Sequence, residues 1–469
     1  MSKTWAAFGA DLHLDLAGTR VRAALERSLR EAVQGGRVRP GTRMPPTRTL
    51  AGDLGVARNT VADAYAQLVA EGWLVARSGS GTWVAERPAQ ARLRQRPDAA
   101  APRTFRYDLR PGAPDLSSFP RAAWHAALRR ALAMAPREAF GYADPRGLPE
   151  LRHALAEYLA RARGVRSDPD HIVVCAGFVH GLALVGSALR SRGAGTLAIE
   201  EDGHRLHHAV IRAAGLSIRT VPVDGHGARV DQFGAAGAAL LTPAHQFPRG
   251  VPLSPDRRAA ALRWAAEHDA VLIEDDYDGE FRYDRQAVGA VQALAPESVM
   301  YAGTASKTLA PGVRLGWLVL PARLLDDVIS AKRLSGGQHA TLDQLAFAEL
   351  LRSGGYDRHV RSRRLTYRRR REQLLAALHR HAPPVRVHGV AAGLHTLLEL
   401  PSAVEESAVI ARAADRGLAL SGLSEHRLSR RPTFPGLVVS FATPPEHAYS
   451  TAIARLCSTL AEVTVCTSS

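Results

Sequence analysis

The chain has 469 residues, which is long for one compact domain, so at least two domains are expected. Its 61 Lys and Arg residues against 45 Asp and Glu residues give a formal net charge of +16, which favours a nucleic-acid-binding protein over an ordinary metabolic enzyme. There is no apolar run of about 18 residues, no signal-peptide pattern and no disulfide framework among three scattered cysteines, which predicts a cytoplasmic protein without membrane contact.

Residues 12–85 are predicted to form a first domain of three helices and a hairpin. Apolar residues at helical spacing predict a helix over about 18–35. A second helix is expected to begin at Thr47, interpreted as its capping residue, and a third near Arg58. Residues 73–84 are typical of a β-hairpin with a glycine-rich tip.

Two helices joined by a short turn and followed by a hairpin are typical of a winged helix-turn-helix. The second helix of such a pair enters the major groove of DNA with its N-terminal residues. Side chains and a hairpin tip that can reach bases or phosphates are therefore the candidate DNA-binding residues: Arg43, Thr47, Arg48, Arg58, Asn59, Thr60 and Gly79.

The run over residues 46–84, PTRTLAGDLGVARNTVADAYAQLVAEGWLVARSGSGTWV, closely resembles the GntR-type winged helix. This resemblance implies that the protein binds double-stranded promoter DNA. Residues 86–104 have no hydrophobic period and are rich in Pro, Ala and Arg, so a linker is predicted there, with a short helix as the alternative.

Residues 105–465 are predicted to form a second domain of α/β class. Short apolar strands alternate with helical segments, which indicates a large part with a mostly parallel sheet, followed by a smaller C-terminal lobe. The expected strands cover residues 172–175, 196–200, 218–223, 238–242, 270–274, 299–303 and 316–320. A very basic helix over about 358–371 is either a solvated face or a second surface toward DNA.

One lysine, Lys307, lies among the groups that an aldehyde cofactor carrying a phosphate requires. Its amine can form a Schiff base. The hydroxyls of Thr304 and Ser306 precede it, and Arg314 follows between two glycines, so hydroxyl and guanidinium donors for a phosphate are close in sequence. The alternative is an ordinary surface lysine.

Two upstream segments add to this stretch. A buried strand over residues 271–273 runs into Asp275 and Tyr277, a carboxylate that could pair with a pyridinium nitrogen and a phenol that could reach a ring hydroxyl. The alternative is a solvated acidic loop. A strand over residues 172–175 leads to Gly177 and Phe178, a glycine turn and helix start whose N–H groups could hold a phosphate.

These three segments, in this order, resemble fold-type I pyridoxal 5′-phosphate (PLP) enzymes of the aminotransferase family, over about residues 105–460. By that resemblance Lys307 carries the cofactor as a Schiff base, Asp275 pairs with its ring nitrogen and Tyr277 bonds its phenolic oxygen. The phosphate is held, again by resemblance, by Thr304, Ser306, Arg314 and the backbone around Gly177.

Three further positions follow from the same resemblance. His204 stands where the family has a tyrosine against the cofactor ring, and it is expected to stack there and to titrate near neutral pH. Tyr142 lies in a Y-x-D-P-x-G element and is expected to reach the cofactor phosphate of a partner subunit, or else to be a packing aromatic. Phe247 replaces an asparagine of true aminotransferases.

A GntR winged helix joined to an aminotransferase-like domain resembles the MocR/GabR-type regulators throughout. The resemblance implies a homodimer with PLP bound, whose large domain senses a ligand instead of running transamination, with a residual half-reaction remaining possible. Val438 stands where aminotransferases hold the substrate carboxylate with an arginine, although a shift of alignment would bring Arg430 or Arg431 into play.

We therefore expect PLP itself to be the effector, in control of vitamin B6 metabolism as in the PdxR-type members. A regulator that senses an amine or amino acid through PLP is the first alternative. An active aminotransferase with a DNA-binding head and a DNA-binding protein with a vestigial cofactor site are the others.

Overall fold

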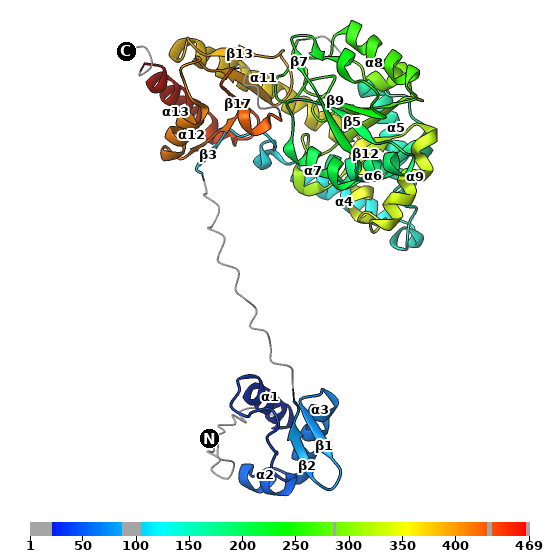
Figure 1. Ribbon diagram of the computed structural model, residues 1–469, viewed down its shortest axis with the longest axis vertical. Helices are drawn as coiled ribbons and strands as arrows, with labels where there is room; N and C mark the ends of the chain where they lie inside the picture. The colour runs from blue at the N-terminus through cyan, green and yellow to red at the C-terminus, as the bar shows by residue number, and fades with distance from the viewer. Residues whose placement is uncertain (1–20, 87–104, 285–287, 429–433, 466–469) are drawn as a thin grey trace. The chain divides into compact units, whose positions relative to one another are not determined.

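The computed structural model describes residues 21–86, 105–284, 288–428 and 434–465, and the chain divides into two compact units, Met1–Pro102 and Arg103–Ser469 (Figure 1). The predicted linker over 86–104 lies, apart from Glu86, outside the described residues, as do residues 12–20 of the predicted first domain. Within the described ranges no helix has both the length and the apolar character needed to cross a membrane.

The first unit has the predicted helices and hairpin. The elements are α1 (Val21–Gln34), α2 (Thr47–Leu54), α3 (Arg58–Ala70), β1 (Leu74–Arg77) and β2 (Gly81–Val84). The three helices share one hydrophobic core, in which Leu25, Leu50 and Val61, one from each helix, are fully buried. β1 pairs with β2 in antiparallel register. The winged helix-turn-helix is confirmed.

The start of α2 corrects one detail of the sequence interpretation. The helix begins at Thr47 as predicted, but Pro46 occupies the capping position and no side chain caps the helix. The Pro46 carbonyl accepts hydrogen bonds from the N–H groups of Thr49 and Leu50, both at 3.0 Å. Because the proline ring fixes its own φ, here −55°, the first turn forms without the Thr47 hydroxyl.

The second unit is built on a seven-stranded sheet with the order β4-β12-β11-β10-β9-β5-β6. Its strands are β4 (Ile172–Cys175), β5 (Thr196–Glu200), β6 (Ser217–Val221), β9 (Ala238–Leu241), β10 (Val271–Asp275), β11 (Val299–Thr304) and β12 (Gly316–Val319). All neighbours are parallel except β12, which runs antiparallel to β4 and to β11. The mostly parallel sheet is confirmed.

The strand expected over 218–223 is wrong in one respect, because it is divided. After β6 ends at Val221, Pro222 intervenes, and β7 (Val223–Asp224) turns away to pair with β8 (Gly227–Ala228). Proline has no N–H to donate to a sheet, so the ladder stops there.

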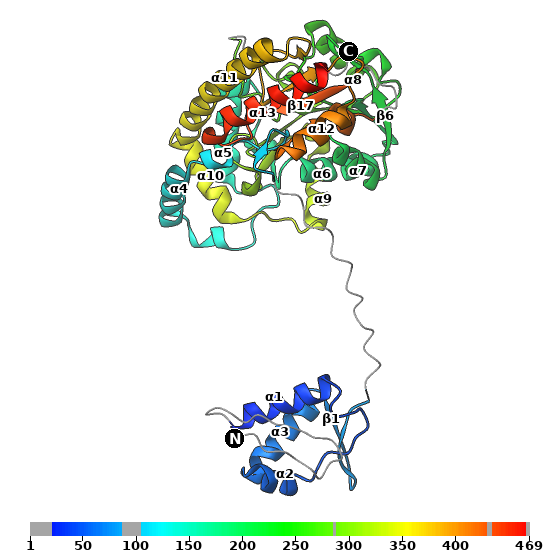
Figure 2. The same ribbon diagram turned by 90° about the vertical axis from the view of Figure 1, so that its left-hand side faces the viewer.

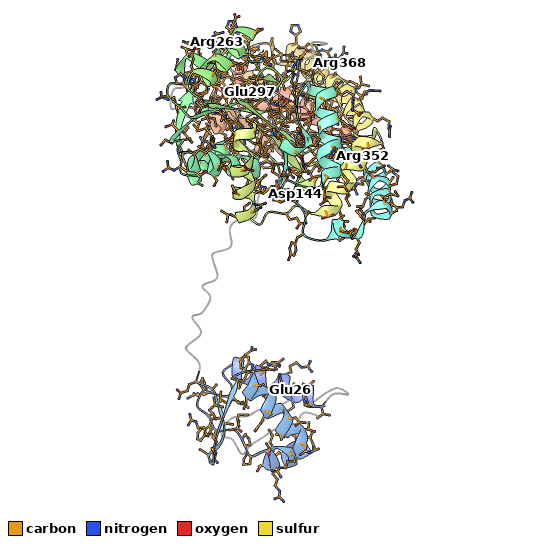
Figure 3. All side chains as sticks on the ribbon, turned by 90° about the vertical axis from the view of Figure 1, so that its right-hand side faces the viewer. Glu26, Asp144, Arg263, Glu297, Arg352 and Arg368 are labelled. Atoms are coloured by element: carbon orange, nitrogen blue, oxygen red, sulfur yellow. The ribbon has the colours of Figure 1, made fainter. Side chains whose placement is uncertain are left out.

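Helices cover both faces of the sheet, as an α/β fold requires. One face packs against α4 (Arg121–Met134), α5 (Pro149–Arg163), α8 (Pro255–Glu267), α10 (Thr341–Arg352) and α11 (Gly355–His381). The other packs against α6 (Phe178–Ser191), α7 (Arg205–Ala213) and α9 (Ala322–Leu334). Figure 3 shows that side chains fill the space between these layers.

A smaller lobe follows in the chain. Its antiparallel sheet has the order β13 (Arg386–His388), β14 (His395–Glu399), β17 (Gly436–Ser440) and β16 (Ser421–Gly422). α13 (Glu446–Val465) packs against α11 and against α12 (Glu406–Asp415) (Figure 2). The beginning of the unit joins this lobe, because β3 (Tyr107–Asp108) pairs with β15 (Leu418–Ala419).

The parallel strands bring five chain segments to one edge of the large sheet. β4, β5, β9, β10 and β11 share a direction, so their carboxyl ends, and the residues that follow them, lie at the same edge. This edge is where open α/β sheets bind ligands.

Two glycines allow a close backbone approach at this edge. Gly177 follows β4 with a φ of +84°, and a Cβ added to Gly316, the first residue of β12, would lie 2.8 Å from the Gly177 Cα. The two backbones can therefore meet only if residue 316 has no side chain.

We predict that Gly316→Ala lowers the free energy of unfolding of the second unit by about 1–3 kcal/mol, because overpacking against backbone has no side chain to move aside. Chemical denaturation followed by tryptophan fluorescence measures it. Gly312→Ala is the control, since a Cβ there meets nothing within 4 Å. Equal stability of both variants and the wild type would contradict this close approach.

Candidate functional site

A cavity of about 270 Å³ opens at the carboxyl edge of the large sheet. It is lined by nine of the ten residues predicted to bind a cofactor: Gly177, Phe178, His204, Asp275, Tyr277, Thr304, Ser306, Lys307 and Arg314. The structure thus brings together predicted site residues that lie up to 137 positions apart in the sequence, from Gly177 to Arg314.

The partly buried amine of Lys307 and the buried carboxyl of Asp275 are two titratable groups that line this cavity. Burial lowers the pKa of the Lys307 amine, while the nearby Asp275 and Asp278 carboxylates act to raise it. Burial likewise raises the pKa of Asp275 well above its usual range, and Lys307 partly offsets this. The Lys307 Nζ donates to the Gly112 carbonyl at 2.5 Å, so the amine is held at the cavity wall.

Hydroxyl and guanidinium donors gather at one end of the cavity. The Thr304 hydroxyl donates to the Ser306 Oγ at 2.9 Å. A Cβ on Gly177 would face the Arg314 Nη1 at 3.7 Å and the Ser306 Oγ at 4.0 Å, so the space in front of the glycine turn is bounded by these donors. The N-terminus of α6, which begins at Phe178, is directed to the same place and favours an anion.

The set fits PLP by its chemistry. An anion site, an amine and a carboxylate line one cavity, and these match the phosphate, the aldehyde and the basic ring nitrogen of that cofactor. The carboxylate comes from β10 and the anion site from the turns after β4 and β11, so separate strands would hold separate parts of one ligand.

His204 lines the cavity, but its predicted titration near neutral pH is wrong. Its ring stacks on Phe247 with centroids 4.1 Å apart and an interplanar angle of 10°. Burial first, and then the neighbouring His207, lower the pKa of His204 to about 2, so the ring is neutral at neutral pH.

Tyr142 lies apart from the other predicted residues. Its side chain is fully exposed and does not line the cavity. Its expected contact with the cofactor of a partner subunit stays a prediction.

Sequence reasoning missed several residues at the site. Gly112, in the arm before α4, accepts from Lys307, and His207 lines the cavity with its ring 4.9 Å from that of Phe178. Glu200 also lines it, and burial raises the pKa of this carboxyl to about 7. Only Glu200 had a usable signal, because it ends a buried strand at the ligand-binding edge.

Asp202 is a further residue of this kind. It lines the cavity and pairs with the Nε of Arg249 at 2.5 Å and with that of Arg427 at 3.5 Å. Since Arg427 belongs to the smaller lobe, Asp202 connects the wall of the cavity to that lobe. Such a connection between distant segments has no local pattern in the sequence.

Val438 lies on β17 and is fully buried, packed with Phe247, Leu397 and Leu423. Among the described residues that line the cavity, the basic side chains of lysine or arginine type are those of Lys307 and Arg314. Arg430 and Arg431, the alternatives to Val438, lie outside the described residues.

The candidate DNA-binding residues lie around the start of α3. Arg58 and Asn59 are its first two residues and are exposed, Arg48 near the start of α2 is exposed, and Thr47 and Thr60 are half-buried. Gly79 is exposed at the hairpin tip with a φ of +70°.

Arg43 is the remaining candidate and lies beside the hairpin. Its residue forms a β-bridge with Trp83, and its guanidinium lies 5.8 Å from the Trp83 ring centroid. The exposed candidates thus come from both helices of the pair and from the hairpin, as the groove contact of a winged helix requires.

Comparison with known proteins matches both units. Residues 21–84 match the family of bacterial regulatory proteins called the gntR family, and residues 109–456 match aminotransferase class I and II. The chain is 32% identical to the probable rhizopine catabolism regulatory protein MocR of Rhizobium meliloti, covering 89% of each chain. It is 31% identical to the pyridoxine biosynthesis transcriptional regulator PdxR of Corynebacterium glutamicum, covering 93% of this chain and 95% of that one.

The second unit also matches a solved structure of an archaeal alanine:glyoxylate aminotransferase. The TM-score is 0.69 at 25% identity, over 77% of this chain and 91% of that one. The fold-type I aminotransferase architecture of the second unit is thereby confirmed, and enzymes of this fold family depend on PLP.

We predict that Asp275→Asn raises the melting temperature of the PLP-free protein at pH 7–8. Burial raises the pKa of Asp275 above its value of about 3.9 in the unfolded chain. The stability that the protonated Asp275 side chain contributes to the fold is therefore fully present below about pH 3.9 and is lost as the pH rises through the folded pKa. Each unit of pKa elevation corresponds to about 1.4 kcal/mol.

The gain should therefore be near zero at about pH 4 and grow toward neutral pH. Scanning calorimetry across this range measures it. Asp231→Asn is the control, since its carboxylate is half exposed and paired with Arg229 at the surface. A lower melting temperature for Asp275→Asn at pH 7–8 would contradict the electrostatic account of the cavity.

Proposed function

The chain belongs to the MocR-type transcriptional regulators, and we propose that it binds PLP through Lys307 and changes its binding to promoter DNA in response. The type combines a gntR-family helix-turn-helix domain, which implies DNA binding, with an aminotransferase-like domain. Because its partner is promoter DNA, its place is in the cytoplasm.

The observation that carries the proposal is the pairing of a buried amine and a buried carboxylate in one cavity with an anion site. Bound PLP would supply an aldehyde that condenses with amines, first of all with the Lys307 Nζ. Asp275 would hold the ring nitrogen, and its cost of burial would then be offset by a protonated partner.

The other residues would orient the cofactor. Thr304, Ser306, Arg314 and the turn at Gly177 would bind the phosphate, and Tyr277 the phenolic oxygen. His204, neutral at neutral pH, would offer a ring face without adding charge.

PLP itself is the effector that the cavity favours. An amino acid effector needs a cation for its carboxylate, and the position expected to supply one is Val438, buried in an apolar cluster. An unpaired carboxylate in a buried site costs several kcal/mol. The name of the PdxR relative, a regulator of pyridoxine biosynthesis, fits control of vitamin B6 metabolism.

An amine that joins PLP in the cavity is the second candidate effector. Glu200 and Asp202 line the cavity and give it acidic groups apart from Asp275. An active aminotransferase is disfavoured, because Phe247 and Val438 replace the asparagine and arginine of those enzymes.

A homodimer would complete the arrangement. The fully exposed Tyr142 would then contact the cofactor phosphate of the partner subunit. PLP would act by binding one arrangement of the dimer more tightly than another, which shifts the DNA-binding domains between positions.

We predict that PLP gives the wild-type protein a visible absorption band and that Lys307→Ala lacks it, because the aldehyde then has no lysine to join. The chain has three lysines, Lys3, Lys307 and Lys332, so borohydride reduction and peptide mass spectrometry assign the attachment directly. Lys3→Ala is the control and should keep the band.

The same samples test the response. PLP should change the affinity of the wild type for its promoter and leave that of Lys307→Ala unchanged. If the band forms but PLP does not change the affinity for DNA, the amine-responsive regulator is favoured. If no band forms, the assignment of PLP as the cofactor is wrong.

We predict that Arg58→Ala weakens promoter binding and lowers the slope of log Kd against log salt concentration by about 0.9, the share of one phosphate contact. Fluorescence anisotropy at several salt concentrations measures both. Arg22→Ala is the control, because Arg22 lies on α1 and is paired with Glu26 (labelled in Figure 3) at 2.9 Å. Equal losses in both variants would argue against α3 as the recognition helix.

A further inference from the structure

A buried hydrogen-bonded pair of side chains, His245 and Asp278, lies beside Tyr277 and does not line the cavity. The Nδ1 of His245 is 2.9 Å from the Asp278 Oδ2, and both side chains are almost completely buried. His245 comes from the loop after β9 and Asp278 from the turn after β10, so the pair joins the ends of two neighbouring strands.

His245 contacts the Tyr277 hydroxyl through two of its atoms, the backbone carbonyl oxygen and the side-chain Nδ1. The Tyr277 hydroxyl donates to the His245 carbonyl at 3.0 Å, and it lies 3.3 Å from the Nδ1 of the same residue. With its proton on Nδ1, the imidazole can donate to the Asp278 carboxylate and to the Tyr277 oxygen together. The phenol is therefore fixed through one residue, and that residue is fixed by Asp278.

The surroundings enclose this pair closely. Gly393 has a φ of +70°, and any Cβ there would overlap the His245 ring and the Asp278 carboxylate. The His395 ring lies 5.1 Å from that of His245. In such a site a hydrogen bond is strong and its geometry is well defined.

We propose that His245 and Asp278 are positioning residues that hold the Tyr277 hydroxyl for the phenolic oxygen of PLP. A phenol has one proton, so on PLP binding this proton would turn from the His245 carbonyl to the phenolic oxygen, while the His245 Nδ1–H would donate to the Tyr277 oxygen. This inference rests on the proposed function. It has a reason in the sequence, because Phe247 replaces the asparagine that shares this contact in aminotransferases. Of those two donors only Tyr277 is present here, so the hydrogen bond to the phenolic oxygen depends on the orientation of the Tyr277 hydroxyl alone.

Two effects of Asp278 on bound PLP have opposite signs, and this makes the proposal testable. The Asp278 charge helps to raise the pKa of Lys307, so its simple removal would move the pH midpoint of the visible spectrum to lower pH. A donor to the phenolic oxygen stabilises the more negative form of the bound cofactor, so losing that donor moves the midpoint to higher pH.

Other charged and titratable groups face Tyr277 and stay constant in the comparison. They are Asp275 on β10, Glu200 on β5, Lys307 after β11 and, through His245, His395 on β14.

The experiment titrates the visible spectrum of PLP-loaded full-length protein with pH and measures the Kd for PLP. The variants are Asp278→Asn, Tyr277→Phe and the double variant. We expect Asp278→Asn to move the midpoint to higher pH, as Tyr277→Phe should, and to weaken PLP binding by roughly 10-fold, by analogy with the loss of a hydrogen-bond partner behind a metal ligand. In the Tyr277→Phe background it should add nothing.

Glu280→Gln is the matched control. Glu280 lies on the same turn, is also buried and bonds the Tyr158 hydroxyl at 3.2 Å, away from the cavity. It should leave the midpoint unchanged. If Asp278→Asn fails to fold, His245→Asn replaces it with the same expected shift.

A midpoint that moves to lower pH, stays in place or moves equally in the Tyr277→Phe background overturns the positioning role and leaves PLP binding intact. A wild-type protein that binds no PLP overturns both this inference and the proposed function.

Discussion

The burial of Asp275 opposite Lys307 is the constraint on which the second unit depends. A carboxylate without water is costly, and the raised pKa of Asp275 and the lowered pKa of Lys307 express that cost. The fold places both groups at the carboxyl edge of the sheet, where β10 and the turn after β11 end side by side. Both groups line the same cavity.

The backbone contributes as much to the site as the side chains do. Gly177 and Gly316 allow the turn after β4 to approach β12, and this brings the start of α6 to Ser306 and Arg314. Arg314 itself has a φ of +53°, a left-handed conformation that is rare for a residue with a side chain. Strain of this kind is tolerated where the surrounding contacts determine the position of a functional group.

Much of the fold and the site could be predicted because their signals are local. The strands are short and apolar, and Asp275, Lys307 and Gly177 directly follow or precede them. The lowered pKa of His204 could not be predicted, since it depends on burial against Phe247 and His207. The contact of Lys307 with Gly112 and that of Asp202 with Arg427 join segments nearly 200 or more residues apart, and no periodicity reports such contacts.

Contacts between distant segments also connect the wall of the cavity to the smaller lobe. The loop that carries Asp202 and His204 is tied to the smaller lobe by backbone hydrogen bonds, from the Gly203 N–H to the His426 carbonyl at 2.7 Å and from the Leu428 N–H to the Glu201 carbonyl at 3.1 Å. A ligand that contacts His204 therefore acts on a segment already fixed to that lobe. Under the proposed function, a contact at the ring face would favour one position of the lobe, because packed elements move as units and not by continuous deformation.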